Sequence, residues 1–462
     1  MTGLGLDVLQ AEIEALRPVK RIGRVAQIGR GAIQVTGLSD VAALGDLVEI
    51  RPARGKPRRG EVLQLAPDAL TVLPDGLIEG LQIADQVLLI GENDISPHDS
   101  WIGRIVDPYG NAVDGGVLLR GADPRPLAGV AINPAQRRRL GGRLETGMAV
   151  FNTLLPIVRG QRIGLFAGSG VGKSTLLGRF AVGLEADLVV IAMIGERGRE
   201  LREFVERVLG PGGMERAIVV AATSDQSALT RRRCAWAAMS VAEHFRDRGK
   251  HVLFVADSVT RFAEAHREVA LAVGEPATYR GFPPSTAHMI TALCERAGPG
   301  PEKSNDITAV FSVLVAGSDM EEPIADILRG VLDGHVVLDH QIAERGRYPA
   351  IDLLRSVSRA LPEAANEEEN AMIQRARHML GTFDRNEMMI QAGLYTKGSD
   401  AGIDAAIRVW PALDRFLAES ENRDTAASFA RLADYLSPDA QTEETKPEEA
   451  KPADTSPNET PA

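Results

Sequence analysis

Near the start of the chain the apolar residues recur in short runs. Between residues 19 and 91 these runs are β-rich and are broken by glycine, proline and aspartate, as in strands that are joined by turns. Five of the runs are GRVAQI, AIQVTG, DLVEIR, GEVLQL and DQVLLI. Strands of this length and spacing predict a small β-barrel or β-sandwich over residues 19–92.

The pattern changes from about Gly164 onward. Continuous apolar runs of strand length alternate with amphipathic helical segments, an order that predicts a parallel sheet covered by helices on both faces. In such sheets ligands bind outside the carboxyl ends of the strands. The apolar runs are IGLF, LVVIAMIG, AIVVAAT, HVLFVAD and ITAVFSVLVAG, and helices are expected from Lys173, over RELREFVERVLG and from Ser227.

The last third of the chain lacks a clear strand pattern. After Pro362 the periodicity indicates helices, so an α/β domain over residues 93–364 is expected to be followed by a helical domain over 365–436. Residues 437–462 contain five prolines and no large apolar side chain. They cannot bury enough surface to offset the entropy of ordering, so this acidic tail is expected to be disordered.

The first 18 residues carry a separate signal. Leu9, Ile13 and Leu16 recur at intervals of four and three residues with acidic residues between them, which gives a short one-sided apolar stripe. A helix of this kind either packs on its own domain or serves as an arm, over residues 1–18, that docks a partner.

Composition narrows the functional classes. The 462 residues include two cysteines, Cys234 and Cys294, that lie far apart, and no histidine falls in an HExxH or Cys/His pattern, so neither a disulfide scaffold nor a zinc site is expected. No apolar run approaches the roughly 20 residues that span a bilayer, and we expect a cytoplasmic protein. The net charge of −11 lies partly in the acidic tail, and even the remaining mildly acidic body disfavours a sequence-independent nucleic-acid translocase.

A glycine-rich segment supplies the clearest chemical motif. The sequence LFAGSGVGKSTLL follows a strand-like run and precedes a helical one, which is the context that a phosphate-binding loop requires. Backbone N–H groups of such a loop converge on phosphate oxygens, and the following helix N-terminus adds partial positive charge. Lys173 is expected at the β- and γ-phosphates and Ser174 on Mg²⁺. The expected nucleotide-binding residues are Gly168, Ser169, Gly170, Val171, Gly172, Lys173, Ser174 and Thr175.

Two acidic residues at strand ends are candidates to complete this site. Asp257 directly follows the apolar run HVLFVA, where a carboxylate could ligate Mg²⁺ or merely cap the next helix. Glu196 ends the run LVVIAMIG and could orient an attacking water. It could equally be a first-turn acid that favours the helix dipole, and its position in the sequence leaves both interpretations open.

Taken together, several motifs resemble those of the ATPases of bacterial type III export, and of the flagellar export ATPase above all. They are AGSGVGKST, GERGRE, ATSDQSAL, DSVTRFAEAHREVALAVGEP, GFPPS, EEPIAD, LDGHVVLD and AERGRYPAIDLLRSVSR, in the same order over roughly residues 20–435. The chain is more distantly similar to the catalytic β-subunit of rotary ATP synthase. The resemblance implies an N-terminal β-barrel, a RecA-like P-loop ATPase core and a C-terminal helical domain.

The resemblance also assigns roles to individual residues. It implies that Glu196 is the catalytic base or water-orienting carboxylate, with Arg197 as a supporting residue, and that Asp257 is the aspartate associated with Mg²⁺. Tyr348 matches the aromatic residue that packs on adenine. Arg359 matches the arginine that a neighbouring subunit inserts into the site, which implies a homohexamer.

Function and partners follow only from the resemblance. It implies ATP hydrolysis that drives release of export substrates from chaperones and their delivery to a membrane gate, with peripheral association at the inner membrane of the flagellar base. The implied partners are a regulatory, stator-like protein at the N-terminal arm, a stalk protein, export gate proteins and substrate–chaperone complexes, with no specific nucleic acid. The alternatives are a virulence injectisome ATPase, a catalytic subunit of rotary ATP synthase and an RNA translocase.

Overall fold

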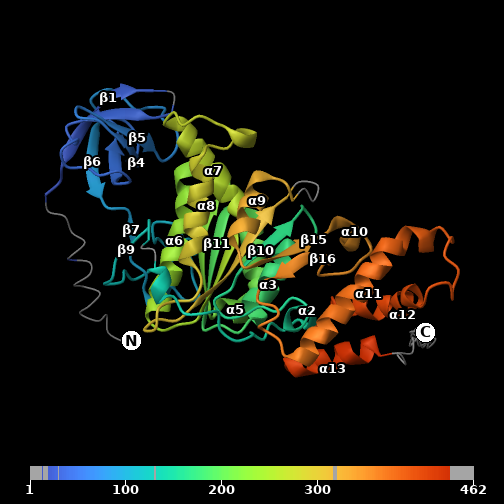
Figure 1. The fold of residues 1–462 in the computed structure, drawn as a ribbon. Helices are drawn as coiled ribbons and strands as arrows, with labels where there is room; N and C mark the ends of the chain where they lie inside the picture. Colours follow the sequence, from blue (N-terminus) through green and yellow to red (C-terminus); the bar gives the residue numbers. More distant parts are fainter. Residues whose placement is uncertain (1–12, 14–18, 30, 130–131, 316–319, 438–462) are drawn as a thin grey trace, which may run out of the picture.

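A barrel, a central sheet and a set of helices follow one another along the chain (Figure 1). The computed structural model describes residue 13 and residues 19–29, 31–129, 132–315 and 320–437. Of the stripe that predicts the N-terminal arm, Ile13 is exposed and Leu9 and Leu16 lie outside the described residues. All but the first residue of the predicted acidic tail also lies outside them. The predicted domain limits remain predictions.

The N-terminal strands close into an antiparallel barrel in the order β1-β2-β5-β4-β3-β6. Alternate side chains point inward, as in β1, where Val25 is buried and the neighbouring Arg24 is exposed, and the interior holds its own apolar cluster around Ile33, Val48 and Val72. The strands are β1 (Ile22–Ile28), β2 (Ile33–Thr36), β3 (Leu47–Arg51), β4 (Arg58–Leu65), β5 (Leu70–Pro74) and β6 (Gln86–Gly91). A two-stranded ribbon of β7 (Asp94–Ile95) and β9 (Arg125–Pro126) follows.

An eight-stranded sheet in the order β16-β15-β10-β14-β13-β11-β12-β8 forms the centre. All neighbours pair in parallel except β15 and β16, which are antiparallel. Most of the strands are buried on both faces, which explains their continuous apolar runs. Their bounds are β8 (Ile105–Val106), β10 (Arg162–Ala167), β11 (Leu188–Glu196), β12 (Ala217–Thr223), β13 (Val252–Asp257), β14 (Ile307–Leu314), β15 (Gly334–Leu338) and β16 (Ile351–Ser358).

Helices cover both faces of the sheet (Figure 1). Successive residues of each strand belong to opposite layers, so that Val189 and Ile191 of β11 pack in one apolar cluster and Val190 in the other. The layer around Val190 includes α6 (Ala228–Asp247), α7 (Val259–Ala272), α8 (Ser285–Arg296) and α9 (Pro323–Val331). On the opposite face lie α2 (Ala149–Asn152), α3 (Lys173–Gly183), α4 (Gly198–Glu203), a π-helical segment η3 (Phe204–Leu209) and α5 (Gly210–Met214).

The chain ends in three helices at the side of the sheet (Figure 1). Each begins at a polar cap, and Asn366 and Glu369 form a reciprocal capping box at the first, which satisfies backbone N–H groups that the helix leaves free. Phe416 and Phe429 pack in the same apolar cluster as Phe180 of α3. The helices are α11 (Glu367–Gln391), α12 (Ala401–Phe416) and α13 (Thr425–Leu436), preceded by α10 (His340–Glu344), and short 3-10 turns occur at η1 (Asp99–Trp101), η2 (Pro134–Gln136) and η4 (Tyr279–Gly281).

Three details depart from the expectation. The single helix expected over RELREFVERVLG is instead α4 and η3, with α5 starting at Gly210, where three glycines and a proline interrupt the pattern. The edge strand β16 is antiparallel, so the sheet is not parallel throughout. The barrel contains β5, a strand absent from the apolar runs singled out in the sequence.

Neither a disulfide bond nor a membrane-spanning helix is found among the described residues. Cys234 and Cys294 are both buried and unbridged. Among the residues described, no helix combines the length and the apolar character needed to cross a membrane.

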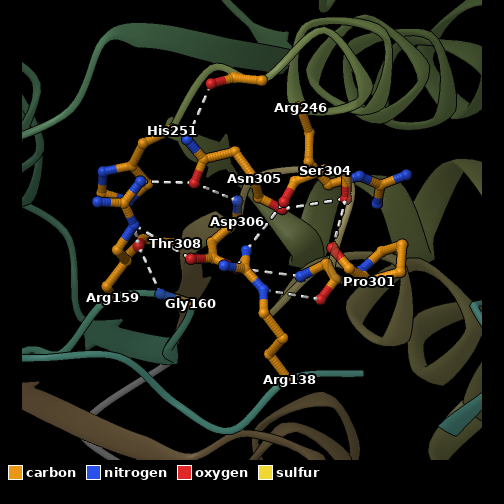
Figure 2. Close-up of polar contacts among 12 residues, drawn as sticks. Arg138, Arg159, Gly160, Arg246, His251, Pro301, Ser304, Asn305, Asp306 and Thr308 are labelled. Carbon is orange, nitrogen blue, oxygen red and sulfur yellow. Dashed lines mark hydrogen bonds and ion pairs between the residues drawn. The ribbon is translucent and has the colours of Figure 1, made fainter. Parts of the chain in front are cut away.

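A polar cluster ties together the starts of three strands (Figure 2). The carboxylate of Asp306, just before β14, accepts hydrogen bonds from Arg138 (2.6 Å) and Arg159 (3.1 Å). His251, just before β13, lies with Nε2 2.9 Å from Thr308 Oγ1. Burial, with a smaller contribution from nearby Arg159, lowers the pKa of His251 to about 4. The folded protein therefore holds this imidazole neutral at pH values where an exposed histidine is charged.

The cluster predicts a pH dependence of stability. Because the unfolded chain binds a proton at His251 below about pH 6.5 and the folded chain does so only near pH 4, stability falls as pH decreases through this window, by about 2 kcal/mol at pH 5. His251→Gln, which cannot titrate, should therefore lose less unfolding free energy between pH 7 and pH 5 than the unchanged protein, as measured by urea denaturation. His288→Gln, at an exposed residue of α8, is the control, and an equal loss in all three proteins would contradict the prediction.

Candidate active site

The glycine-rich loop joins the end of β10 to the start of α3. Gly170 and Gly172 have φ angles of 82° and 89°, in the left-handed region that favours glycine. Ser169 is exposed, as are Ser174 and Thr175 in the first turn of α3. The loop therefore presents hydroxyl groups at the carboxyl edge of the sheet, next to the N-terminus of α3. A helix N-terminus of this kind stabilises a bound phosphate.

Two side chains, His340 at the start of α10 and Tyr348 after its end, pack against this loop. A Cβ atom on Gly168 would lie 2.3 Å from Nε2 of His340, and one on Gly172 would lie 3.3 Å from Cδ1 of Tyr348. Tyr348 is 50% exposed, so part of its ring remains free beside the loop. The loop is thus bracketed from one side, and glycine at positions 168 and 172 permits that approach.

Lys173, the first residue of α3, forms an ion pair with Asp257 at the end of β13. Asp257 is 2% exposed, and its Oδ1 also accepts a hydrogen bond of 2.8 Å from Ser312 Oγ of β14. A buried carboxylate requires such partners, because leaving a charge unpaired away from water costs several kcal/mol. The Lys173–Asp257 ion pair therefore joins the phosphate loop to the carboxyl end of β13.

Glu196 lies at the end of β11, after an irregularity in its pairing with β12. Its Oε1 is buried without a hydrogen-bond partner in the part of the chain that the structure describes, and Lys173 Nζ lies 3.9 Å away. Burial raises the pKa of Glu196 to about 7, with Asp257 adding to the increase and Lys173 opposing it. A carboxyl group of this kind can exchange a proton near neutral pH, as a general base must.

Two of the expected residues lie elsewhere. Arg197 is 81% exposed and faces Glu200 of α4 at 3.6 Å. Arg359, after β16, donates its backbone N–H to Asp333, which in turn donates to the carbonyl of Arg162 at the start of β10. Because the phosphate loop follows the other end of β10, Arg359 lies at the opposite edge of the sheet from the loop of its own chain.

Three residues near the site, Ser312, His340 and Arg231, were not predicted from the sequence. Ser312 is the second polar residue, after Thr308, in an otherwise apolar buried strand, which is a usable signal in the sequence. His340 follows the end of β15, the edge at which sites form in such sheets. The stem of Arg231 of α6 lies 3.3 Å from the position of a Cβ on Gly195, and nothing in the sequence pattern indicates that proximity.

Comparisons with known proteins cover nearly the whole described chain. Residues 147–358 match the model of the ATP synthase alpha/beta family, nucleotide-binding domain, and residues 365–434 match that of the T3SS EscN ATPase C-terminal domain. A flagellum-specific ATP synthase of Caulobacter vibrioides is 42% identical over 93% of this chain and 98% of its own length.

Two solved structures extend the comparison. The assembled ATPase EscN from the type III secretion system of enteropathogenic E. coli has a TM-score of 0.82 at 34% identity, covering 90% of this chain and all of its own. EscN in complex with its central stalk EscO has a TM-score of 0.81 at the same identity, with the same coverage.

The fold and the loop define a P-loop ATPase with a RecA-like sheet, and the expected barrel, core and helical domain are confirmed. Given the extent of the identity, the chain belongs to the family of flagellum-specific and type III secretion ATPases. It is an ATP-hydrolysing enzyme.

The conformation of the loop predicts a graded effect of substitution. Gly172→Ala adds a side chain in the left-handed region and against Tyr348, so ATP affinity should fall by about tenfold or more, since such strain costs about 1–2 kcal/mol. Gly170→Ala, with the same backbone conformation but open space around its Cβ position, should weaken binding less.

Both affinities are measured by calorimetric titration with ATP. Gly212→Ala in α5, which has neither a positive φ nor a close neighbour, is the control for the loop substitutions. Equal affinity of the Gly172 variant and this control would show that the loop does not bind phosphate.

Proposed function

We propose that Glu196 orients and deprotonates the water that attacks the terminal phosphoryl group of ATP. The observation that carries this role is its buried Oε1 atom, which has no hydrogen-bond partner although Lys173 is only 3.9 Å away. A desolvated acceptor without a partner is costly, and a water held between Glu196 and the phosphate would relieve that cost. Lys173 would stabilise charge on the phosphoryl oxygens.

We infer that Mg²⁺ accompanies the nucleotide. The hydroxyl of Ser174 and the carboxylate of Asp257 are hard oxygen donors of the kind that Mg²⁺ prefers. When Glu196 is ionised, Lys173, Asp257 and Glu196 together carry one excess negative charge in a mostly buried environment, which a divalent cation complements. When bound, the ion would neutralise charge on the phosphates, while Ser312 holds Asp257 in place through its hydrogen bond.

The remaining contacts to the nucleotide belong to the loop and to two further side chains. Residues 168–175 would surround the phosphates with backbone N–H groups and hydroxyls. Tyr348, with a half-exposed ring beside Gly172, would pack on the adenine. Arg197, the N-cap residue of α4, is mostly exposed and faces Glu200, and we assign it a supporting role at the phosphates.

We propose that hydrolysis occurs at the seam between protomers of a homohexamer. Arg359 is exposed and lies across the sheet from its own loop, so it can act only on the site of a neighbouring chain. An arginine supplied from a neighbour stabilises the charge that develops in the transition state. The assembled state of the similar ATPase EscN supports a ring.

In the cell, we propose that the ring serves the flagellar type III export apparatus, where hydrolysis drives release of substrates from chaperones and their delivery to the membrane gate. The names of the relatives support the flagellar assignment. The proposed setting is the cytoplasmic side of the inner membrane, in peripheral association. The proposed partners are a stator-like regulator at the N-terminal arm, a stalk protein such as the one bound to EscN, gate proteins and chaperone complexes.

Replacement of Glu196 tests its role directly. Glu196→Gln keeps the size of the side chain but removes its basicity, so turnover of ATP should fall by about 100-fold or more while ATP affinity stays within about threefold. Steady-state phosphate release and calorimetric titration measure the two quantities. Glu203→Gln on the adjacent helix, where Glu203 forms an exposed ion pair with Arg207 at 3.9 Å, is the matched control. Normal turnover of the Glu196 variant would remove the assignment.

The same variant tests the export role in the host. With Glu196→Gln at ordinary expression levels, swimming and secretion of flagellin should be lost, and Glu203→Gln should preserve both. Normal motility with loss of another type III secretion phenotype would instead favour an injectisome.

Mixing of two inactive variants tests the seam. Lys173→Ala damages the site and keeps the arginine, whereas Arg359→Ala keeps the site and removes the arginine. In a random equal mixture about one seam in four pairs an intact site with an intact arginine, so about a quarter of the normal turnover should return. Turnover is measured for each variant alone and for the mixture.

Ring formation by each protein is checked by light scattering. Mixed rings without any recovery of turnover would contradict the role of Arg359 in a neighbour's site.

A further inference from the structure

Three hydroxyl groups converge on one carboxylate at the rim of the barrel. Asp75, directly after β5, accepts hydrogen bonds from Thr230 Oγ1 at 2.8 and 2.9 Å and from the hydroxyl of Tyr109 at 2.9 Å. Ser227 Oγ also donates to it. Ser227 is the N-cap of α6, so a residue of the barrel fixes the first turn of a helix of the ATPase core.

Further polar contacts surround this point. Arg232 of α6 and Glu61 of β4 form an ion pair of 2.7 Å in which both side chains are almost fully buried. The guanidinium groups of Arg59 and Arg233 lie over the ring of Tyr109, 4.0 and 4.5 Å from its centroid. Directional contacts of this kind specify one geometry, although they stabilise a fold less efficiently than apolar packing.

The opposite side of the same turn contacts the catalytic strand. Ser224 donates its backbone N–H to the carbonyl of Glu196 at 3.0 Å. Arg231 donates from Nε to the carbonyl of Gln226 at 3.1 Å, and its stem lies against Gly195. The segment from Ser224 to Arg231 therefore contacts Asp75 on one side and the peptide of Glu196 on the other.

We propose that Asp75 is a positioning residue for catalysis, through which the barrel holds the 224–231 segment against Glu196. This inference rests on the proposed function of Glu196. The barrel shares no apolar cluster with the core in the part of the chain that the structure describes. These polar contacts therefore couple the orientation of the barrel to the position of Glu196. A change in the orientation of the barrel then changes the position of the catalytic carboxylate.

This arrangement predicts which kinetic parameter changes. The phosphate loop lies on β10 and α3, outside the 224–231 segment, so ATP binding does not depend on Asp75. Displacement of a catalytic group by about 1 Å can cost a factor of about 100 in rate. Loss of Asp75 should therefore lower kcat and leave ATP affinity nearly unchanged.

The experiment compares two contacts between barrel and core. Asp75→Ala removes the hydrogen bonds from all three hydroxyl groups and should lower kcat by about tenfold or more, with ATP affinity within about twofold. The control is Gln64→Ala, which removes the hydrogen bond of 2.9 Å from Gln64 Nε2 to the carbonyl of Val273 after α7, away from Glu196. Equal kcat in the two variants, or a loss of ATP affinity that accounts for the effect, would overturn the inference.

Two additions separate the outcomes. If Asp75→Ala does not fold, Asp75→Asn, which keeps the shape and one acceptor oxygen, is measured in the same way. In a Glu196→Gln background, Asp75→Ala should cause no further loss, because both changes act on one group, and an additive loss would contradict the inference. Full turnover of the Glu196→Gln variant would refute the proposed function. If that variant loses turnover while the Asp75 variants keep a normal kcat, only the positioning role is refuted.

Discussion

The contact between Lys173 and Asp257 is the constraint on which the active site depends. It joins the glycine-rich loop on β10 to the carboxyl end of β13, two strands on either side of β14. A buried carboxylate needs a cation or donors nearby, and here the lysine and Ser312 supply both. With Lys173 paired to Asp257, the buried Oε1 of Glu196 has no hydrogen-bond partner among the described residues. The same ion pair brings the phosphate loop within reach of the ends of β13 and β11.

Much of the fold could be predicted from the sequence because its strands follow simple rules. Doubly buried strands read as continuous apolar runs, and the barrel strands alternate, so the barrel and most of the sheet were predictable. β5 was missed because LTVLP is short and ends in proline, and the antiparallel β16 was missed because exposed residues such as Leu354 and Arg355 interrupt its apolar pattern. The π-helical segment after α4 has no sequence signal that we recognise.

The site was predictable to the extent that its residues are adjacent in sequence or end a strand. The loop, Asp257 and Glu196 satisfy that condition. The sequence left open whether the two acidic residues cap helices, and the structure shows that Asp257 pairs with Lys173. Asp75 and Ser227 are more than 150 residues apart, and no periodicity relates them. The role of Arg359 came from family resemblance alone, because its position opposite the loop becomes evident only when the strand register is known.

The distribution of apolar clusters shows that the barrel and the C-terminal helices are attached to the core in different ways. Phe416 and Phe429 of the C-terminal helices share one close-packed interior with Phe180 of the phosphate-binding helix, and such interiors deform little. The barrel has a separate interior and meets the core through hydroxyls and ions. The C-terminal helices and the phosphate-binding helix are thus packed as one body, whereas the barrel is held to the core by directional polar contacts. In a ring, a displacement of the C-terminal helices would reach the nucleotide through packed side chains, whereas a tilt of the barrel would strain the hydrogen bonds to Asp75.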